Sequence, residues 1–234
     1  MTAKRSKEDL LELYEATGDE TAFREALPLF ELAVANGATP EDLVHYGYLL
    51  ESHARNQMRE AVAQYERAIE LDPEFDKARY QLIGARAGLR EPETEIALYE
   101  KRLADSPGDI RQYRFAANAY LAGSMFAKAL EAAKHGLSLW PDDAILLFCR
   151  ADARAGLGDT EGALTDYGLA LASDPEHIGP LYMKAFLLER IGRRQEAIDT
   201  WQAIFEWNDS RDYELDTIWP KKELERLRSG RSAS

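Results

Sequence analysis

The sequence has little of what builds disulfide-bonded, membrane or β-sheet proteins. It has one cysteine in 234 residues, Cys149, so no disulfide can form within the chain. No apolar run reaches the roughly 18 residues that a membrane span needs. The N-terminus, MTAKRSKEDLLELYEA, becomes charged where a signal peptide needs its apolar segment. Alternating β-branched runs are absent. These absences predict an all-α protein of the cytoplasm.

Positive charge is also scarce. The chain has 29 Lys and Arg against 42 Asp and Glu, a formal net charge of −13. A uniformly acidic surface repels phosphate groups, because affinity for nucleic acids comes largely from Lys and Arg that displace counterions. The one basic stretch, residues 221–231, is interrupted by Glu223 and Glu225. We therefore expect neither a nucleic acid nor a membrane as partner.

The residues that carry chemistry lack the spacing that chemistry needs. None of the four histidines has a second ligand at the spacings that build zinc sites. The glycines of GLGDTEG lie between two predicted helices, and no strand precedes them as a phosphate-binding loop requires. The apolar setting of Cys149, LLFCRAD, indicates a buried or groove-lining thiol rather than a nucleophile. We predict a protein that is not an enzyme, with no cofactor and no metal site.

A period of 34 residues is the strongest feature of the sequence. Pro73, Pro107, Pro141 and Pro175 follow one another at this spacing. Three further series share the period: Ala61, Glu95, Ala129, Ala163 and Ala197; Tyr65, Tyr99, Ala133, Tyr167 and Trp201; and Ala68, Arg102, Gly136, Ala170 and Ile204. Their offsets of four and seven place these three series on one face of a helix, which each proline then ends. With a first helix before it, each period predicts two antiparallel helices.

This pattern resembles the tetratricopeptide repeat. Residues 144–177 carry its helix A signature at Ala151 and Leu157-Gly158, and its helix B signature at Ala163, Tyr167 and Ala170. The resemblance implies an α–α superhelix, a right-handed solenoid of about six helix pairs that forms a single domain over residues 1–228. The implied repeats are 7–40, 42–75, 76–109, 110–143, 144–177 and 178–209, followed by a capping helix at about 217–228 and a mobile tail at 229–234.

The repeat 178–209 ends in Asn208-Asp209 instead of a proline, and three other repeats depart further from the pattern. In 7–40, Gly18-Asp19-Glu20 implies a longer turn, and in 42–75 the helix A pair is replaced by Tyr48-Leu49. In 76–109, Glu95 and Arg102 take places that prefer small residues. Two interpretations stay open for that repeat. Either these side chains pair with each other, or with Arg79 or Arg86, or the helix slides or rotates and exposes them.

The resemblance also implies a binding surface, because helix A of each repeat lines the concave groove in this family. The positions carried over are Tyr46, Leu50, Tyr80, Gln81, Arg111, Arg114, Phe115, Asn118, Phe148, Asp152, Tyr182, Met183 and Phe186. Arg111, Arg114 and Asn118 share one helical stripe that would suit a carboxylate. The alternative for Arg114 is an ion pair with Asp152 on the neighbouring helix.

These features predict a scaffold or adaptor that holds a protein or peptide segment in its groove. The expected partner is a protein or peptide, and an acidic side chain or a C-terminal carboxylate on that partner is one group that the groove could bind. The alternative is a structural subunit that self-associates, as a homo-oligomer, or docks through its convex face or terminal helices.

Overall fold

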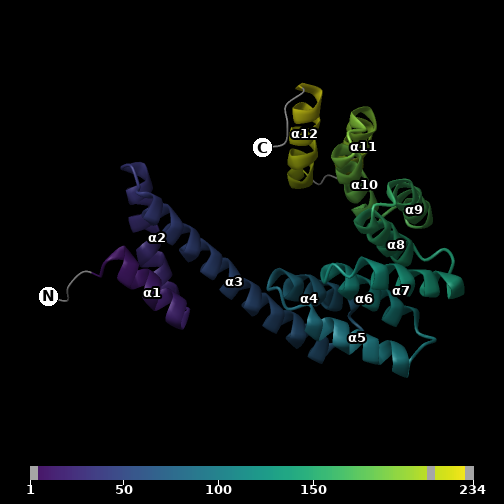
Figure 1. Cartoon of the computed structure of the whole chain (residues 1–234), viewed down its shortest axis with the longest axis horizontal. Coiled ribbons are helices and arrows are strands. Elements are labelled where there is room, and N and C mark those ends of the chain that lie inside the picture. The colour runs from purple at the N-terminus through teal and green to yellow at the C-terminus, as the bar shows by residue number, and fades with distance from the viewer. Residues whose placement is uncertain (1–4, 210–213, 230–234) are drawn as a thin grey trace. The chain divides into compact units, whose positions relative to one another are not determined.

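The structure, a computed structural model, describes residues 5–209 and 214–229. In these ranges the chain forms twelve α-helices and no strand, which confirms the all-α prediction (Figure 1). The contacts divide the chain into two compact units, unit 1 at Met1–Glu91 and unit 2 at Pro92–Ser234. The single solenoid expected over residues 1–228 stays a prediction.

Unit 1 is built from four helices. They are α1 (Lys7–Thr17), α2 (Glu20–Ala35), α3 (Pro40–Leu71) and α4 (Asp76–Gly88). Capping boxes start α1 at Ser6 and α3 at Thr39. Tyr14, Phe30 and Leu49 are fully buried where α1, α2 and the first half of α3 meet.

The turn between α1 and α2 is short. Gly18 adopts the left-handed conformation, with φ 69°, and Asp19 caps α2 through the backbone N–H of Thr21. The longer turn predicted at this place is therefore wrong. A glycine that takes positive φ reverses the chain without extra residues.

Helix α3 is one continuous helix of 32 residues where the repeat 42–75 predicts two. In the four repeats that follow, a residue with positive φ reverses the chain, at Arg90, Ser124, Gly158 and Gly192, each 34 residues after the last. The corresponding residue of the earlier repeat is Asn56, and it lies inside α3. The predicted helix pair is wrong here because residues 56–60, NQMRE, contain neither glycine nor proline and favour the helix.

Unit 2 contains eight helices in its described residues. They are α5 (Glu93–Asp105), α6 (Ile110–Ala122), α7 (Phe126–Leu139), α8 (Ala144–Leu157), α9 (Thr160–Ser173), α10 (Gly179–Arg190), α11 (Arg194–Asp209) and α12 (Glu214–Ser229). The pairs α6/α7, α8/α9 and α10/α11 occupy the repeats 110–143, 144–177 and 178–209. Their small helix B residues Ala129, Ala163 and Ala197 have no exposed surface, so the neighbouring helix approaches closely.

The last helix covers the end of the array. Leu224 and Leu227 of α12 pack against Trp201 and Ile204 of α11. This places a capping helix at Glu214–Ser229, slightly longer than the predicted 217–228. Of the tail predicted at 229–234, Ser229 belongs to α12 and the remainder lies outside the described residues.

Glu95 and Arg102 are the two residues by which helix α5 departs from the repeat pattern. Glu95 is only 2% exposed, so the interpretation in which the helix turns to expose this carboxylate is wrong. The Arg102 guanidinium lies over the ring of Tyr99, 5.7 Å from its centroid, which is a cation–π contact. A charged side chain thus lies along the aromatic residue of helix B.

Candidate functional site

Three first helices of repeats, α6, α8 and α10, follow one another in unit 2, and each contacts the next. They carry nine of the predicted groove residues. On α6, Phe115 is 2% exposed and its ring centroid lies 5.2 Å from that of Tyr99. The prediction that Phe115 lines the groove is therefore wrong, because this side chain belongs to the core between α5 and α6. Asn118 donates to the backbone oxygen of Arg114 at 2.9 Å and lies 3.3 Å from the sulfur of Cys149.

Both arginines of the predicted stripe hold carboxylates of this chain. Arg111 donates to Asp109, with Nη2 3.3 Å from Oδ2. Arg114 Nε lies 3.1 and 3.0 Å from the two carboxylate oxygens of Asp143. The alternative prediction, an ion pair of Arg114 with Asp152, is therefore wrong. Arg114 does form an ion pair, but its partner is Asp143, the residue before α8.

Asp152 instead bonds within its own repeat. Its carboxylate accepts a hydrogen bond of 2.6 Å from the hydroxyl of Tyr167. Burial raises the pKa of Asp152 to about 6, and the bond from Tyr167 opposes part of that rise. Phe148 lies beside it, with its ring 6.1 Å from Tyr167 and edge-on to His177 at 5.3 Å. This part of α8 is a packed aromatic cluster that holds one protonatable carboxylate.

Cys149 is fully buried. Of the two settings predicted for its thiol, buried or groove-lining, the structure has the first. Burial raises the pKa of its thiol far above the ordinary value, so the thiolate is strongly disfavoured. His177 is half-buried, and burial lowers its pKa. Neither residue has the environment of an activated nucleophile or base.

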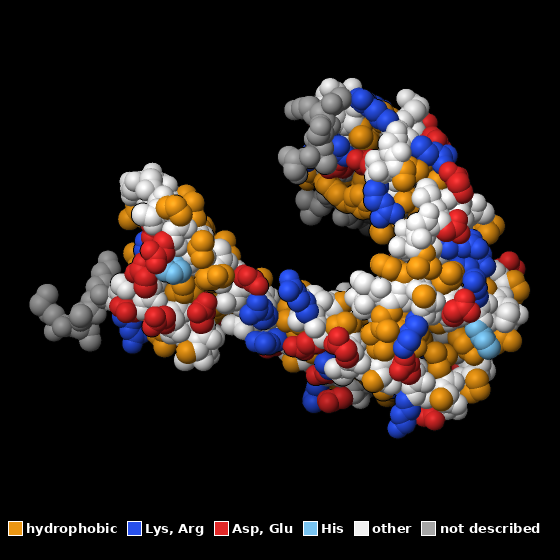
Figure 2. Space-filling view, in the orientation of Figure 1, with side chains coloured by type: hydrophobic (Ala, Val, Ile, Leu, Met, Phe, Trp, Pro, Cys, Tyr) orange, Lys and Arg blue, Asp and Glu red, His pale blue; other side chains and the backbone are white. Residues whose placement is uncertain are grey.

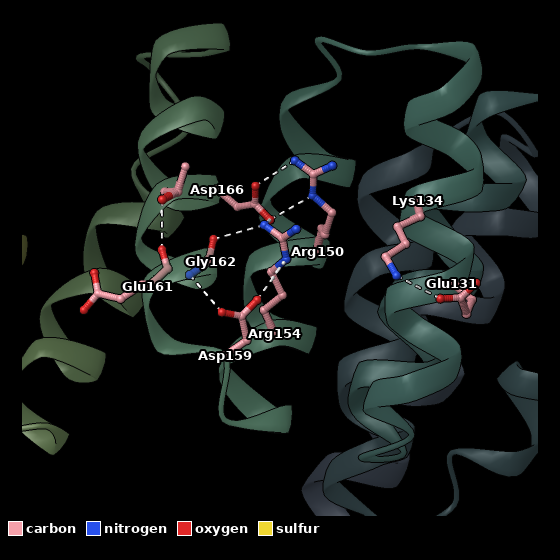
Figure 3. Close-up of polar contacts among 9 residues, drawn as sticks. Glu131, Lys134, Arg150, Arg154, Asp159, Glu161, Gly162 and Asp166 are labelled. Carbon is pink, nitrogen blue, oxygen red and sulfur yellow. Dashed lines mark hydrogen bonds and ion pairs between the residues drawn. The ribbon is translucent and has the colours of Figure 1, made fainter.

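A charged cluster that the sequence analysis missed joins α8 to α9 (Figure 3). Asp166 is 1% exposed. Its carboxylate accepts two hydrogen bonds from Arg150, of 2.8 and 2.7 Å, and one from Arg154, of 2.8 Å. Arg154 also contacts the backbone oxygen of Gly162 at 3.3 Å. The spacing of the two arginines, four apart on one helix, was the available signal. These ion pairs join α8 to α9, so the two arginines already have a partner within the chain and are not candidates for binding a ligand.

An apolar surface is exposed where α10 and α12 lie together. It consists of Met183, Phe186, Ile218 and Trp219, which are 38, 40, 49 and 45% exposed, and we call it the α10–α12 surface. The ring of Trp219 lies 5.5 Å from that of Phe186 and stacks on Tyr182 at 6.0 Å. Figure 2 shows hydrophobic side chains gathered at this place. The sequence predicted the α10 residues but not their continuity with Trp219.

The other four predicted residues belong to unit 1. The ring of Tyr46 stacks on Phe30 at 6.0 Å, and Leu50 is 43% exposed on α3. On α4, Tyr80 is half-buried and Gln81 is exposed. They form a set separate from the residues of unit 2.

Two absences hold for the part of the chain that the structure describes. No three His, Cys, Asp or Glu side chains there lie together as metal ligands would. No helix in residues 5–209 and 214–229 has the length and apolar character needed to cross a bilayer.

The chain is similar to proteins of one repeat family. The family model described as the tetratricopeptide repeat matches residues 45–75. A thermophilic repeat protein of this kind from Thermus thermophilus superposes with a TM-score of 0.56, at 18% identity, over 95% of this chain and 98% of that one. The APC/C hetero-tetramer Cut9–Hcn1 matches with a TM-score of 0.54, at 12% identity, and there this chain spans 51% of the other. No curated protein matches the sequence. Identities this low show the fold alone.

Proposed function

We propose that this chain, which shares its fold with tetratricopeptide-repeat proteins, is a non-catalytic scaffold that binds a protein or peptide segment through unit 2. The observation that carries the proposal is the α10–α12 surface. Single exposed apolar residues are ordinary on a protein surface, whereas contiguous ones mark contact sites. Met183 and Phe186 lie on α10 at i and i+3, and Trp219 extends the same surface onto α12. The first helices α6, α8 and α10 supply the rest of the groove.

The partner's anchor is apolar in this proposal. Aromatic residues contribute most of the energy at many interfaces, because they bury large areas with little loss of conformational freedom. Arg111 and Arg114 already hold Asp109 and Asp143, so an acidic group on the partner would have to displace one of these. A carboxylate on the partner is therefore a secondary determinant beside the apolar anchor.

A structural subunit is the alternative function that the same surface supports. Ile218 and Trp219 lie on α12, the last described helix, where a neighbouring subunit would dock onto the end of the array. The two functions differ in what they bind. A scaffold takes a short segment on its own, whereas a docked subunit requires the folded neighbour.

Selection of displayed peptides on the full immobilised chain tests the proposal. Selected peptides are synthesised, and their Kd is measured by fluorescence anisotropy. We expect Met183→Ala/Phe186→Ala to raise Kd at least about tenfold. The matched control, Leu139→Ala/Leu169→Ala, removes side chains that are 50 and 47% exposed elsewhere in unit 2 and should change Kd less than about twofold.

Circular dichroism of each variant shows that the fold is retained. If no peptide is selected, or if the α10 variant and the control bind alike, the α10–α12 surface is not a peptide site and the structural-subunit function takes its place.

A further inference from the structure

The continuous helix α3 presents two matching triplets of residues on one face. Leu43, Gly47 and Leu50 are spaced by four and three residues, and so are Ala61, Tyr65 and Ala68. The second triplet begins 18 residues after the first, which is five turns of an α-helix. In a straight helix both triplets therefore point the same way. We call these six residues the α3 face.

The second triplet lacks the cover that its counterparts have. In the repeat 144–177 the equivalent residues Ala163, Tyr167 and Ala170 are at most 1% exposed, and in 178–209 Ala197, Trp201 and Ile204 have no exposed surface. Ala61, Tyr65 and Ala68 are only half-buried. In the later repeats an antiparallel first helix, α8 or α10, packs on this side. Because α3 does not turn back at Asn56, that helix is missing.

The first triplet is open as well. Leu43 and Leu50 are 52 and 43% exposed, and a Cβ added at Gly47 would meet no atom within 4 Å. The side of α3 that packs against α1 and α2 is a different one. Leu49 is buried and His53 stacks on Phe23 at 3.8 Å in the core with α1 and α2.

We propose that the α3 face is an interface between two copies of this chain, in which the two α3 helices pack antiparallel. Centred between residues 55 and 56, this arrangement places Leu43 opposite Ala68 and Leu50 opposite Ala61, and it brings Gly47 to within one residue, about 1.5 Å along the axis, of the level of Tyr65. Each large side chain then faces a small one, which lets the helices approach closely. A parallel pair would instead oppose Tyr65 to Tyr65 and Gly47 to Gly47.

The same geometry explains why the occupant is a second copy. The missing element is an antiparallel helix, and the first half of another α3 can supply one. It would do so through Leu43, Gly47 and Leu50, because Leu49 and His53, the counterparts of Ala151 and Ala155 that pack α8 on α9, already face α1 and α2. The arrangement is isologous, since each copy covers the second triplet of the other with its own first triplet. Every residue of the face is uncharged, so its burial leaves no unpaired charge. The inference is independent of the proposed function of unit 2.

A spin label at one position tests the geometry. Arg67 has a side chain that is 69% exposed, and it is changed to Cys in a background in which the buried Cys149 is changed to Ala. Light scattering should report a dimer. Electron–electron resonance should give a label separation of about 35 Å, because 23 residues at 1.5 Å separate the two positions along the paired helices. A parallel pair would bring the labels to within about 20 Å.

Two variants and one control test the residues. Gly47→Leu fills the gap beside Tyr65 while favouring the helix, so the fold is kept and the dimer dissociation constant should rise at least about tenfold. Leu50→Ala/Tyr65→Ala should raise it similarly. Leu71→Ala removes a side chain that is 76% exposed and not part of the face, and should leave the constant within about twofold.

Three results would overturn the proposal. They are a monomer at every concentration tested, a dimer with another label separation, and a dimer that Gly47→Leu leaves intact. A monomer in which α3 has folded back at Asn56 would complete the repeat within one chain. Labels at Glu41→Cys and Glu70→Cys would then lie far closer than the roughly 44 Å of a straight helix.

Discussion

Arg114 on α6 and Asp143 before α8 form an ion pair in which Nε of the arginine lies 3.1 and 3.0 Å from the two carboxylate oxygens. Asp143 also accepts the backbone N–H of Leu146 at 2.9 Å and so caps α8. The side chain of Asp143 is 6% exposed and that of Arg114 is 26% exposed. One carboxylate therefore fixes the start of one repeat and joins it to the helix before.

Arg114→Ala should destabilise unit 2. Removing the guanidinium leaves a nearly buried carboxylate with its cap bond alone, which costs on the order of 1–3 kcal/mol of unfolding free energy. Lys134→Ala is the matched control, because that lysine side chain is 49% exposed and pairs with Glu131 only three residues away on the same helix. The control should cost less than about 0.5 kcal/mol. Urea denaturation measures both, and equal losses would mean that the Arg114 pair acts as a surface contact.

The carboxyl group of Asp152 should make stability depend on pH. Burial raises the pKa of Asp152 to about 6, above the value of about 4 in the unfolded chain. The folded state therefore binds more protons between these values, and this group's contribution to stability falls as pH rises from about 4 to about 6. Asp152→Asn has no such titration. Relative to the unchanged protein, the variant should gain on the order of 2 kcal/mol between pH 4 and pH 7 in urea denaturation.

The Tyr167 hydroxyl provides the control for that prediction. Its hydrogen bond lowers the pKa of Asp152, so Tyr167→Phe should move the titration upward. The carboxyl carbon of Asp152, followed by nuclear magnetic resonance across the pH range, reports the midpoint directly. A midpoint near 4 in the unchanged protein would show that Asp152 is solvated, and the predicted pH dependence would then be absent.

Two glycines of second helices should respond in opposite directions to alanine. A Cβ at Gly136 would lie 2.5 Å from Leu146 and 3.1 Å from Tyr113, so Gly136→Ala forces a shift in a packed core and should cost about 1–3 kcal/mol. A Cβ at Gly168 would meet nothing within 4 Å, and Gly168→Ala should stabilise α9 by about 0.5–1 kcal/mol. Thermal and urea denaturation of the two variants test this. A loss at Gly168 would show that this helix face is covered.

Much of the fold was predictable because it repeats. The small, aromatic and small residues of each second helix are set by close helix packing, which local spacing reveals. Ala163, Tyr167 and Ala170 were placed in a core by their offsets alone, and the structure buries all three. The capping helix was predictable for a similar reason, since Leu224 and Leu227 give it one apolar stripe that needs a partner.

The candidate site was less predictable. The family positions placed Phe115 in the groove, but the ring packs on Tyr99, because α5 approaches α6 on that side. Met183 and Phe186 were predicted on α10. The contact of Phe186 with Trp219, which makes a surface of them, depends on how α12 packs on the array. Spacing within one helix does not reveal which distant side chain lies beside it.

The sequence by itself determined the period, the helices and the residues that pack between them, because these follow from which side chains fit one face of a helix. Only the tertiary structure decided that Arg114 pairs with Asp143 and that two arginines surround Asp166, since both depend on the distance between helices. It also decided that α3 runs through Asn56 without turning. Where neither glycine nor proline forces the chain to reverse, the balance between one long helix and two paired ones depends on what packs against them.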